Sequence, residues 1–243
     1  MKLSTGIQSE WQKVKHTSFW IVHTIMPLAG ALFFTFYFSL YGSVEAEAKL
    51  KLVLELTGMM FPLLTGVVVG LNIQLEERAS HMQTLLSLPN RRRGFLAKLI
   101  VLYGTGVLSL STLFVLFLVG TGLAGQWKEV LFMELLLSVV GLAWSSFVIY
   151  IMHFIFSLKF GLGFSLFWGI FESLQCIMYS NIELHGAARY IPFAWGMNWI
   201  HDVLNHTLLQ NMAQWILNVG ITICMLFAAM QWFTHWEGRK HEE

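Results

Sequence analysis

The stretch FWIVHTIMPLAGALFFTFYFSLY, residues 19–41, decides the fold of this chain. It contains no Asp, Glu, Lys or Arg, and as a helix rising ~1.5 Å per residue it would reach about 34 Å. The hydrocarbon core of a bilayer is ~30 Å thick, so the stretch is long and apolar enough to cross it. The sequence therefore predicts a membrane-spanning helix at residues 19–41.

Further apolar stretches of similar length follow this first one. Across the 243 residues, 56% are hydrophobic and 12% are charged, whereas about 25% of residues are charged in soluble domains. This composition excludes a soluble globular enzyme, a disordered chain and a secreted disulfide scaffold, because so few charges could not cover the apolar surface. We expect an all-α, polytopic membrane protein with one transmembrane domain over residues 1–243. Its six spans are expected at about residues 19–41, 52–74, 99–122, 131–156, 160–180 and 213–233.

The segment before the first span, residues 1–18, is polar but keeps a helical apolar spacing. Lys13 and Lys15 fall on the opposite side from the apolar positions, which favours a helix lying on the membrane surface. The apolar positions are Leu3, Ile7, Trp11 and Val14. A polar tail without regular structure is the alternative.

The basic residues orient the six spans, because cytoplasmic loops carry an excess of Lys and Arg. One set of connecting segments holds Lys2, Lys13, Lys15, Arg78, Arg91, Arg92, Arg93, Lys98, Lys159, Arg239 and Lys240. The opposite set holds only Lys49, Lys51, Lys128 and Arg189. We expect both termini in the cytoplasm.

The segment between the second and third spans, residues 75–98, is the longest strongly charged part of the chain. Acidic and basic residues extend the second span, a short amphipathic turn follows, and three arginines precede the third span. The residues alone fit either an ordinary charged loop that sets topology or a stiff element that a partner grips. The alternative for Arg91, Arg92 and Arg93 is that they hold anionic lipid headgroups.

The run ERASHMQTLLSLPNRRRGFLAK, residues 77–98, resembles the corresponding run of type-2 ABC exporter permeases. Among them the whole chain is most similar to the small permeases of lantibiotic immunity and bacitracin export. The resemblance implies the fold above, with a cytoplasmic coupling helix between spans two and three. It further implies outer re-entrant or amphipathic helices before span six.

The same resemblance implies an ATP-driven exporter that expels a membrane-active peptide antibiotic from a bacterial cell membrane. Its partners would be an ABC ATPase subunit, a second permease, membrane lipid and the peptide, with no nucleic acid. The chain has no G-x-x-x-x-G-K-[ST] run to cradle phosphates, so it would carry no cofactor and perform no hydrolysis. ATP and Mg would belong to the partner chain.

Carried onto this sequence, the resemblance places the ATPase-coupling role on two groups of residues. The stalk would be formed by Glu76, Glu77 and Arg78. The apolar knob that enters the ATPase would be formed by Leu85, Leu86, Leu88 and Pro89.

A carboxylate near the middle of the fifth span, Glu172, is the second unusual feature. An ionised carboxylate there costs ~2.5–3.5 kcal/mol on insertion scales, so its helix face should point into the bundle or a dimer seam. Gln175 lies beside it. The functional interpretation is a contact on the path of a cationic peptide, and the structural one is a hydrogen-bonded or protonated Glu that holds helices together. His23 and His153 are expected to be packing histidines.

The outer segment, residues 181–212, is rich in Trp, His and Asn. We expect Trp195 and Trp199 on short amphipathic helices in the outer leaflet, where they would meet the peptide or only anchor the chain. A metal site is the less favoured alternative, since His201 and His206 are five residues apart. Its further ligands would be Glu183, His185 and Asp202.

Two other functions compete with transport. Glu76-Glu77 together with His201 and Asn205 has a superficial likeness to the motifs of intramembrane proteases, although the charge-derived topology separates the pairs. A membrane immunity protein that sequesters the peptide without transporting it is the other alternative.

Overall fold

The computed structural model describes residues 2–15, 17, 19–41, 44–126, 130–179 and 185–239. Over these residues it is all-helical and contains no strand, as predicted. Six of its helices are long and apolar enough to cross a membrane, which confirms the predicted class of polytopic helical membrane protein. That the whole chain forms one domain stays a prediction.

The elements follow one another without long connections. The six long helices are α2 (Phe19–Leu40), α3 (Ala46–Ser80), α5 (Arg91–Leu123), α6 (Phe132–Phe160), α7 (Leu162–Tyr179) and α10 (Met212–His235). The short ones are α1 (Leu3–Val14), α4 (Gln83–Leu86), α8 (His185–Ala188), the 3₁₀ turn η3 (Pro192–Ala194) and α9 (Trp195–Leu204).

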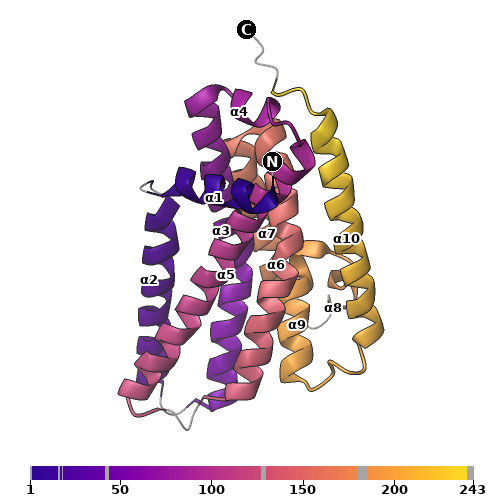
Figure 1. Cartoon of the computed structure of the whole chain (residues 1–243). Helices are drawn as coiled ribbons and strands as arrows, with labels where there is room; N and C mark the ends of the chain where they lie inside the picture. Colours follow the sequence, from indigo (N-terminus) through magenta and orange to yellow (C-terminus); the bar gives the residue numbers. More distant parts are fainter. Residues whose placement is uncertain are drawn as a thin grey trace.

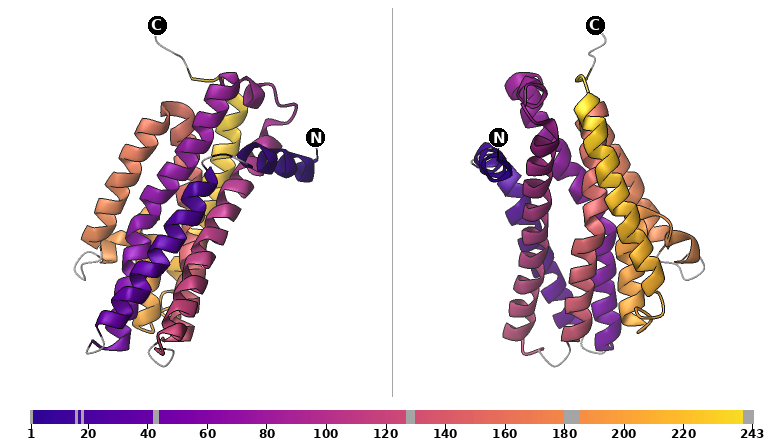
Figure 2. Two further views of the ribbon diagram at one scale, coloured as in Figure 1. Left: turned by 90° about the vertical axis from the view of Figure 1, so that its left-hand side faces the viewer. Right: turned by 45° about the vertical axis from the view of Figure 1, so that its right-hand side comes forward.

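The long helices run side by side, while α1 lies across them at the end of the bundle that carries α4 (Figures 1 and 2). The C-terminal end of α10 lies at this same end of the bundle, which we call the α4 end. α3 and α5 are longer than the spans expected at 52–74 and 99–122, because both continue as helix towards α4. The charged residues between these spans therefore lie mainly on helical extensions rather than in a loop.

α3 forms the centre of the bundle and packs on α7 and α6, whereas α2 packs mainly on α5. An apolar cluster at the α4 end joins α1, α3, α5, α6 and α10, and includes Val14, Phe95 and Phe233. A second cluster further from α4 joins α2, α3, α5, α6 and α9. α1 therefore belongs to the packed bundle and is more than a surface anchor.

α9 lies against α6 and α3 at the end of the bundle opposite α4 (Figure 1). Its apolar side faces inward, with Trp195 fully buried and Ile200 1% exposed. Tyr190, in contrast, is 68% exposed just before η3. Trp195 and Trp199, expected on short amphipathic helices, both lie on α9, which packs on α6 and α3; that they dip into the outer leaflet stays a prediction.

Candidate functional site

The turn between α3 and α5, residues 81–90, is built by local backbone signals. His81 ends α3 in the left-handed region at φ 47°, and Met82 follows at φ 66°, so the chain reverses before α4. The Asn90 side chain accepts a hydrogen bond from the Arg93 backbone N–H at 3.0 Å and caps α5. We call residues 81–90 the docking turn, after the coupling role that the sequence resemblance implies for them.

The apolar residues of the docking turn face the bundle. Leu85 is 2% exposed and Met82 is 3% exposed within the apolar cluster of the α4 end, and Leu86 and Leu88 are half-buried beside them. Leu88 lies directly over Gly94, where an added Cβ would overlap the end of the Leu88 side chain. The surface side of the turn is formed by His81, Gln83, Thr84, Ser87 and Pro89. Of the predicted knob, Pro89 is therefore the exposed member, because the leucines complete the core under α1 and α10.

Arginine side chains tie the docking turn to the end of α10. Arg91 donates to the backbone oxygens of Leu86, Thr234 and Trp236 at 2.9, 3.3 and 2.7 Å. Arg92 donates to Gln231 Oε1 at 2.6 Å. Arg91 thus caps free carbonyl groups at the end of α10 instead of reaching a lipid headgroup.

The stalk residue Glu77 is paired with the C-terminal segment. Its Oε1 lies 2.7 Å from Arg239 Nη1, and Arg239 also donates to the Ser157 backbone oxygen at 2.8 Å. Arg78 is exposed at the end of α3. α3, α6 and the segment after α10 are therefore held together next to the docking turn.

Glu76, the first predicted stalk residue, lies inside a buried cluster of four charges. Lys98 is 2% exposed, and its Nζ lies 2.8 Å from Glu76 Oε1 and 2.6 Å from Glu10 Oε2. Lys13 Nζ lies 2.7 Å from Glu10 Oε1 and 2.8 Å from Glu76 Oε1. Asn72 Oδ1 accepts a further bond from Lys98 at 3.1 Å. The cluster has no net charge and joins α1, α3 and α5.

Lys13 keeps its charge within this cluster. Burial acts to lower the pKa of Lys13, but the adjacent Glu10 and Glu76 carboxylates outweigh it and raise that pKa. Buried charges are tolerated only when each has partners, and every member here has at least two. No local sequence pattern predicts the cluster, because Lys13 and Lys98 also fit the charge bias that orients the spans. The available signal is Glu10, the acidic residue among the otherwise basic residues 1–18.

Glu172 lies at a buried junction of α3, α6 and α7. Its Oε2 lies 3.0 Å from His153 Nε2, and its Oε1 accepts from Trp168 Nε1 at 2.8 Å. His153 Nδ1 lies 2.9 Å from Ser165 Oγ, which donates to the Gly66 backbone oxygen at 3.1 Å. The side chains of Glu172 and His153 are both 0% exposed.

The polar atoms of this junction satisfy one another inside the bundle. The Ser165 hydroxyl lies within hydrogen-bond distance of both His153 Nδ1 and the Gly66 backbone oxygen. Both Glu172 oxygens have partners, His153 Nε2 and Trp168 Nε1. One proton shared between His153 and Glu172 would leave the pair without net charge, and such pairing is what a carboxyl group at this depth needs.

The other predicted path residues are placed differently. Gln175 is half-buried one turn beyond Glu172. Trp195 donates from Nε1 to the Arg189 backbone oxygen at 3.0 Å, and Trp199 donates to the Leu137 backbone oxygen at 2.9 Å. Both rings pack in a tryptophan cluster with Trp144 and Trp215. In this conformation the two tryptophans hold α9 onto α6.

Asp202, at the end of α9, organises the turn into α10. It is 2% exposed, and its carboxylate accepts from Asn211 Nδ2 at 2.8 Å, Thr207 Oγ1 at 3.1 Å and Trp215 Nε1 at 3.1 Å. Arg189 Nη2 lies 3.5 Å from the same side chain. This network gives the buried Asp202 carboxylate partners from the turn, from α10 and from Arg189.

Neither alternative site is assembled within the described chain. No group of three His, Cys, Asp or Glu residues is close enough to hold a metal ion among the residues searched, and Glu183 and the His185 side chain lie outside them. Glu76 lies at the α4 end, whereas the helix with His201 lies at the opposite end (Figure 1). The glutamate and histidine pairs of the protease hypothesis therefore do not share a site.

Comparison with known proteins gives a family match. A family model described as "ABC-2 family transporter protein" matches residues 6–172, which include most of α1, the docking turn and Glu172. Neither a curated protein nor a solved structure matches the chain.

Proposed function

The chain belongs to the ABC-2 family of transporter proteins, and from this membership we propose that it is the membrane half of an ATP-driven exporter. It is a multi-pass membrane permease of that type and lacks the ATPase. The family match carries the proposal, and the docking turn with its tethers supports it. Permeases of this kind generally pair with an ATPase subunit, so hydrolysis of ATP with Mg takes place on a separate chain.

The ATPase subunit docks on the docking turn. The turn stands beyond the apolar part of the bundle on the helical extensions of α3 and α5 (Figure 1). Its surface side is polar, with Gln83, Thr84 and Ser87 exposed, and its leucines anchor it from below. The ATPase therefore contacts the surface side of the docking turn, which includes Pro89, while Leu85 and Leu86 keep the turn rigid.

Movement of the docking turn is passed to several helices at once. The four-charge cluster connects the extension of α3 to α5 and α1. Arg91 connects the turn to α10, and the Glu77–Arg239 pair connects α3 to the segment after α10. When the ATPase subunits close on each other, they move the docking turn. The α4 end then shifts as a unit, and the membrane-spanning helices change their orientation relative to one another.

The α4 end faces the cytoplasm of a bacterial cell, with both termini on that side. Most basic residues lie at this end, which is the arrangement that the positive-inside rule favours. α1 and the end of α10 lie at the same end of the bundle, in agreement with an even number of spans (Figure 1).

The cargo is a membrane-active peptide antibiotic, expelled outward by two permease chains with two ATPase chains. The resemblance of residues 77–98 and of the overall plan to antibiotic-export permeases supports this substrate class. Trp195 and Trp199 reach a peptide only after α9 moves away from α6, so they act as an outer gate. Glu172 and Gln175 lie on α7 and contribute to the path by shaping that helix. Glu172 does not offer a free charge to the peptide, because it is paired with His153.

Co-purification with the ATPase tests this function. The tagged permease is extracted from its native membranes, and the ATPase subunit that accompanies it is quantified for the wild type, Thr84→Trp and Thr112→Trp. Both threonines are exposed, but Thr112 lies on α5 away from the docking turn. We expect Thr84→Trp to lose the ATPase and Thr112→Trp to retain it; equal recovery from all three proteins contradicts the docking assignment.

A further inference from the structure

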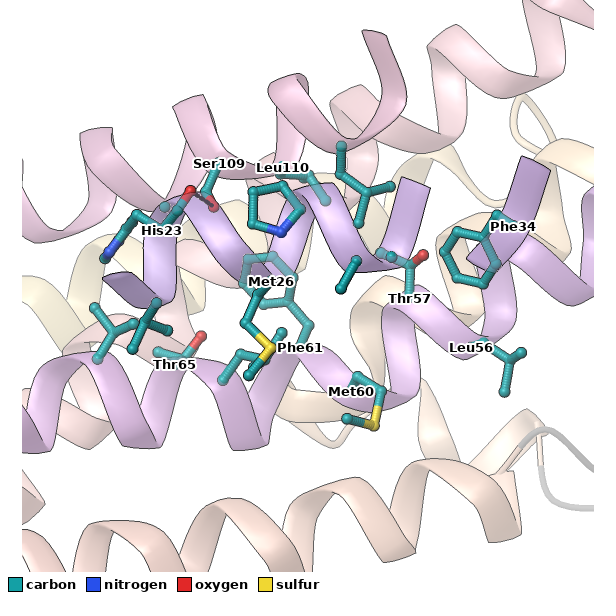
Figure 3. Close-up of a pocket in the computed structure, with 18 of the residues that line it drawn as sticks. His23, Met26, Phe34, Leu56, Thr57, Met60, Phe61, Thr65, Ser109 and Leu110 are labelled. Atoms are coloured by element: carbon teal, nitrogen blue, oxygen red, sulfur yellow. Dashed lines mark hydrogen bonds between the residues drawn. The ribbon is translucent and has the colours of Figure 1, made fainter. Parts of the chain in front are cut away.

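A cavity of about 400 Å³ lies between α2 and α3, with α5 and α6 behind it (Figure 3). Pockets that bind small ligands typically measure about 300–1,000 Å³, so it is large enough to hold one. Its walls are mainly apolar, and no Asp, Glu, Lys or Arg lines it among the described residues. None of the residues proposed for coupling contributes to it.

The cavity opens sideways between α2 and α3. Met26 and Phe33 on α2, and Met60 on α3, line it and are 48%, 59% and 48% exposed. These side chains lie on the apolar surface of membrane-spanning helices, so their exposed surface faces lipid. The mouth of the cavity is therefore open to the bilayer and not to water.

Most of the polar side chains that line the cavity gather at one end of it. His23, Thr65 and Ser109 lie together towards the α4 end, while Phe34 and Leu56 line the far part (Figure 3). The Ser109 hydroxyl donates to the His23 backbone oxygen at 3.1 Å, whereas His23 Nε2 has no hydrogen-bond partner among the described residues. Thr57 is also in the far part, but its hydroxyl donates to the Val53 backbone oxygen at 2.8 Å. The far part therefore presents mostly carbon atoms to an occupant.

The length of the cavity matches one leaflet. On α2 the lining residues run from Val22 to Phe34, twelve residues apart, or about 18 Å at ~1.5 Å per residue. Half of a hydrocarbon core of ~30 Å is about 15 Å. A chain that enters at the His23 end and stops near Phe34 therefore spans the leaflet on the α4 side.

We propose that this cavity binds one acyl chain of a phospholipid from the leaflet on the α4 side, with the polar ester region at His23. An empty apolar space of this size would forfeit the contacts of its lining atoms, and water would find few partners in its far part. Three features favour a lipid chain as the occupant: the cavity opens towards lipid, its polar side chains lie mainly at the His23 end, and its length is about that of one leaflet. The proposal rests on the membrane-spanning fold alone and does not depend on the ATPase or the cargo.

Native mass spectrometry of the full-length chain measures the bound lipid. The protein is reconstituted with a phosphatidylglycerol that carries a photoreactive diazirine within one acyl chain, then stripped with detergent. We expect about one lipid retained per wild-type chain. After irradiation, cross-links should concentrate on cavity residues such as Met60 and Phe61, above the level at Ile216 and Phe227, which face lipid on α10.

A matched pair of variants separates the cavity from ordinary lipid contact. Ala29 is exposed on α2 and lines the cavity, whereas Ala213 is exposed on α10 and does not. Ala29→Phe should release the retained lipid and remove the cavity cross-links, and Ala213→Phe should leave both unchanged. Thermal unfolding of both variants verifies that they fold, and Met60→Trp replaces Ala29→Phe if that variant does not. Absence of a retained lipid from the wild type, or equal cross-linking in Ala29→Phe and Ala213→Phe, overturns the proposal.

Discussion

Lys98 Nζ lies 2.8 Å from Glu76 Oε1, and the two side chains are 2% and 6% exposed, so a buried ion pair joins α3 to α5 directly below the docking turn. Glu10 and Lys13 complete the cluster from α1. A residue that the sequence places on a stalk for a partner is thus an internal support of that stalk. α4 is only a single helical turn of 4 residues, so the rigidity of the docking turn depends on the helices that carry it.

Removing one charge from the cluster should destabilise the protein strongly. Lys98→Met leaves Glu76 and Glu10 with one lysine between them, and breaking a buried pair in this way costs about 3–5 kcal/mol. The double variant Glu76→Met with Lys98→Met leaves Glu10 and Lys13 paired and should recover much of the loss. Thermal unfolding in detergent checks both, and a double variant less stable than Lys98→Met would contradict the cluster.

Glu172 should tolerate a neutral amide but not an apolar side chain. In Glu172→Gln the amide donates to His153 Nε2 and accepts from Trp168. The free energy of unfolding should therefore change by less than about 1 kcal/mol. Glu172→Leu leaves both partners unsatisfied and should cost about 1–3 kcal/mol. Unfolding measurements on the two variants decide this; equal losses would show that a negative charge, not a neutral pair, is required.

Two glycines of the spans should respond in opposite ways. A Cβ on Gly141 would overlap the Trp199 indole, so Gly141→Val should cost about 1–3 kcal/mol and loosen α9. Gly104 on α5 has open space, and Gly104→Ala should stabilise by about 0.5–1 kcal/mol through helix propensity. Limited proteolysis of residues 205–211 reports α9 release, and a Gly141→Val protein cut no faster than wild type would argue against the gate.

Cysteine labelling tests the orientation. In a Cys224→Ala background, which leaves only the buried Cys176, Thr84→Cys should react with a membrane-impermeant maleimide only after the cells are opened. Asn205→Cys should react in intact cells. Labelling of both positions from the outside would reject the cytoplasmic docking turn. It would also revive the protease hypothesis, which needs the glutamate pair and the His201 region on the same side of the membrane.

Much of the fold could be predicted because the bilayer imposes simple rules on composition and length. Residues 19–41 correspond closely to α2, and the helical spacing of Leu3, Ile7, Trp11 and Val14 appears in α1. The length of α3 could not be predicted in this way. The apolar pattern stops at the membrane boundary, but Ala46–Ser80 continues beyond it as one helix, whose charged end pairs through Glu76 with Lys13 of α1 and Lys98 of α5.

The candidate site was harder to predict, because its geometry depends on contacts between distant residues. Glu172 stood out from its cost in a span, yet its partner His153 was expected only to pack. The burial of Leu85 could not be predicted from the pattern alone, since a one-turn helix has no period long enough to show which side faces the core; its coupling role stays a prediction. Pairing of Lys98 with Glu10 needs α1 to lie on α5, which no local pattern states.

Site-specific photo-cross-linking in the assembled transporter tests the central claim most directly. A photoreactive amino acid is placed at Thr84 or, as the control, at Thr112, and the membranes are irradiated before extraction. The account predicts a covalent adduct with the ATPase subunit from position 84 and none from position 112. An adduct absent from position 84, while the ATPase still co-purifies with the permease, would contradict the docking turn as the point where ATP hydrolysis drives this protein.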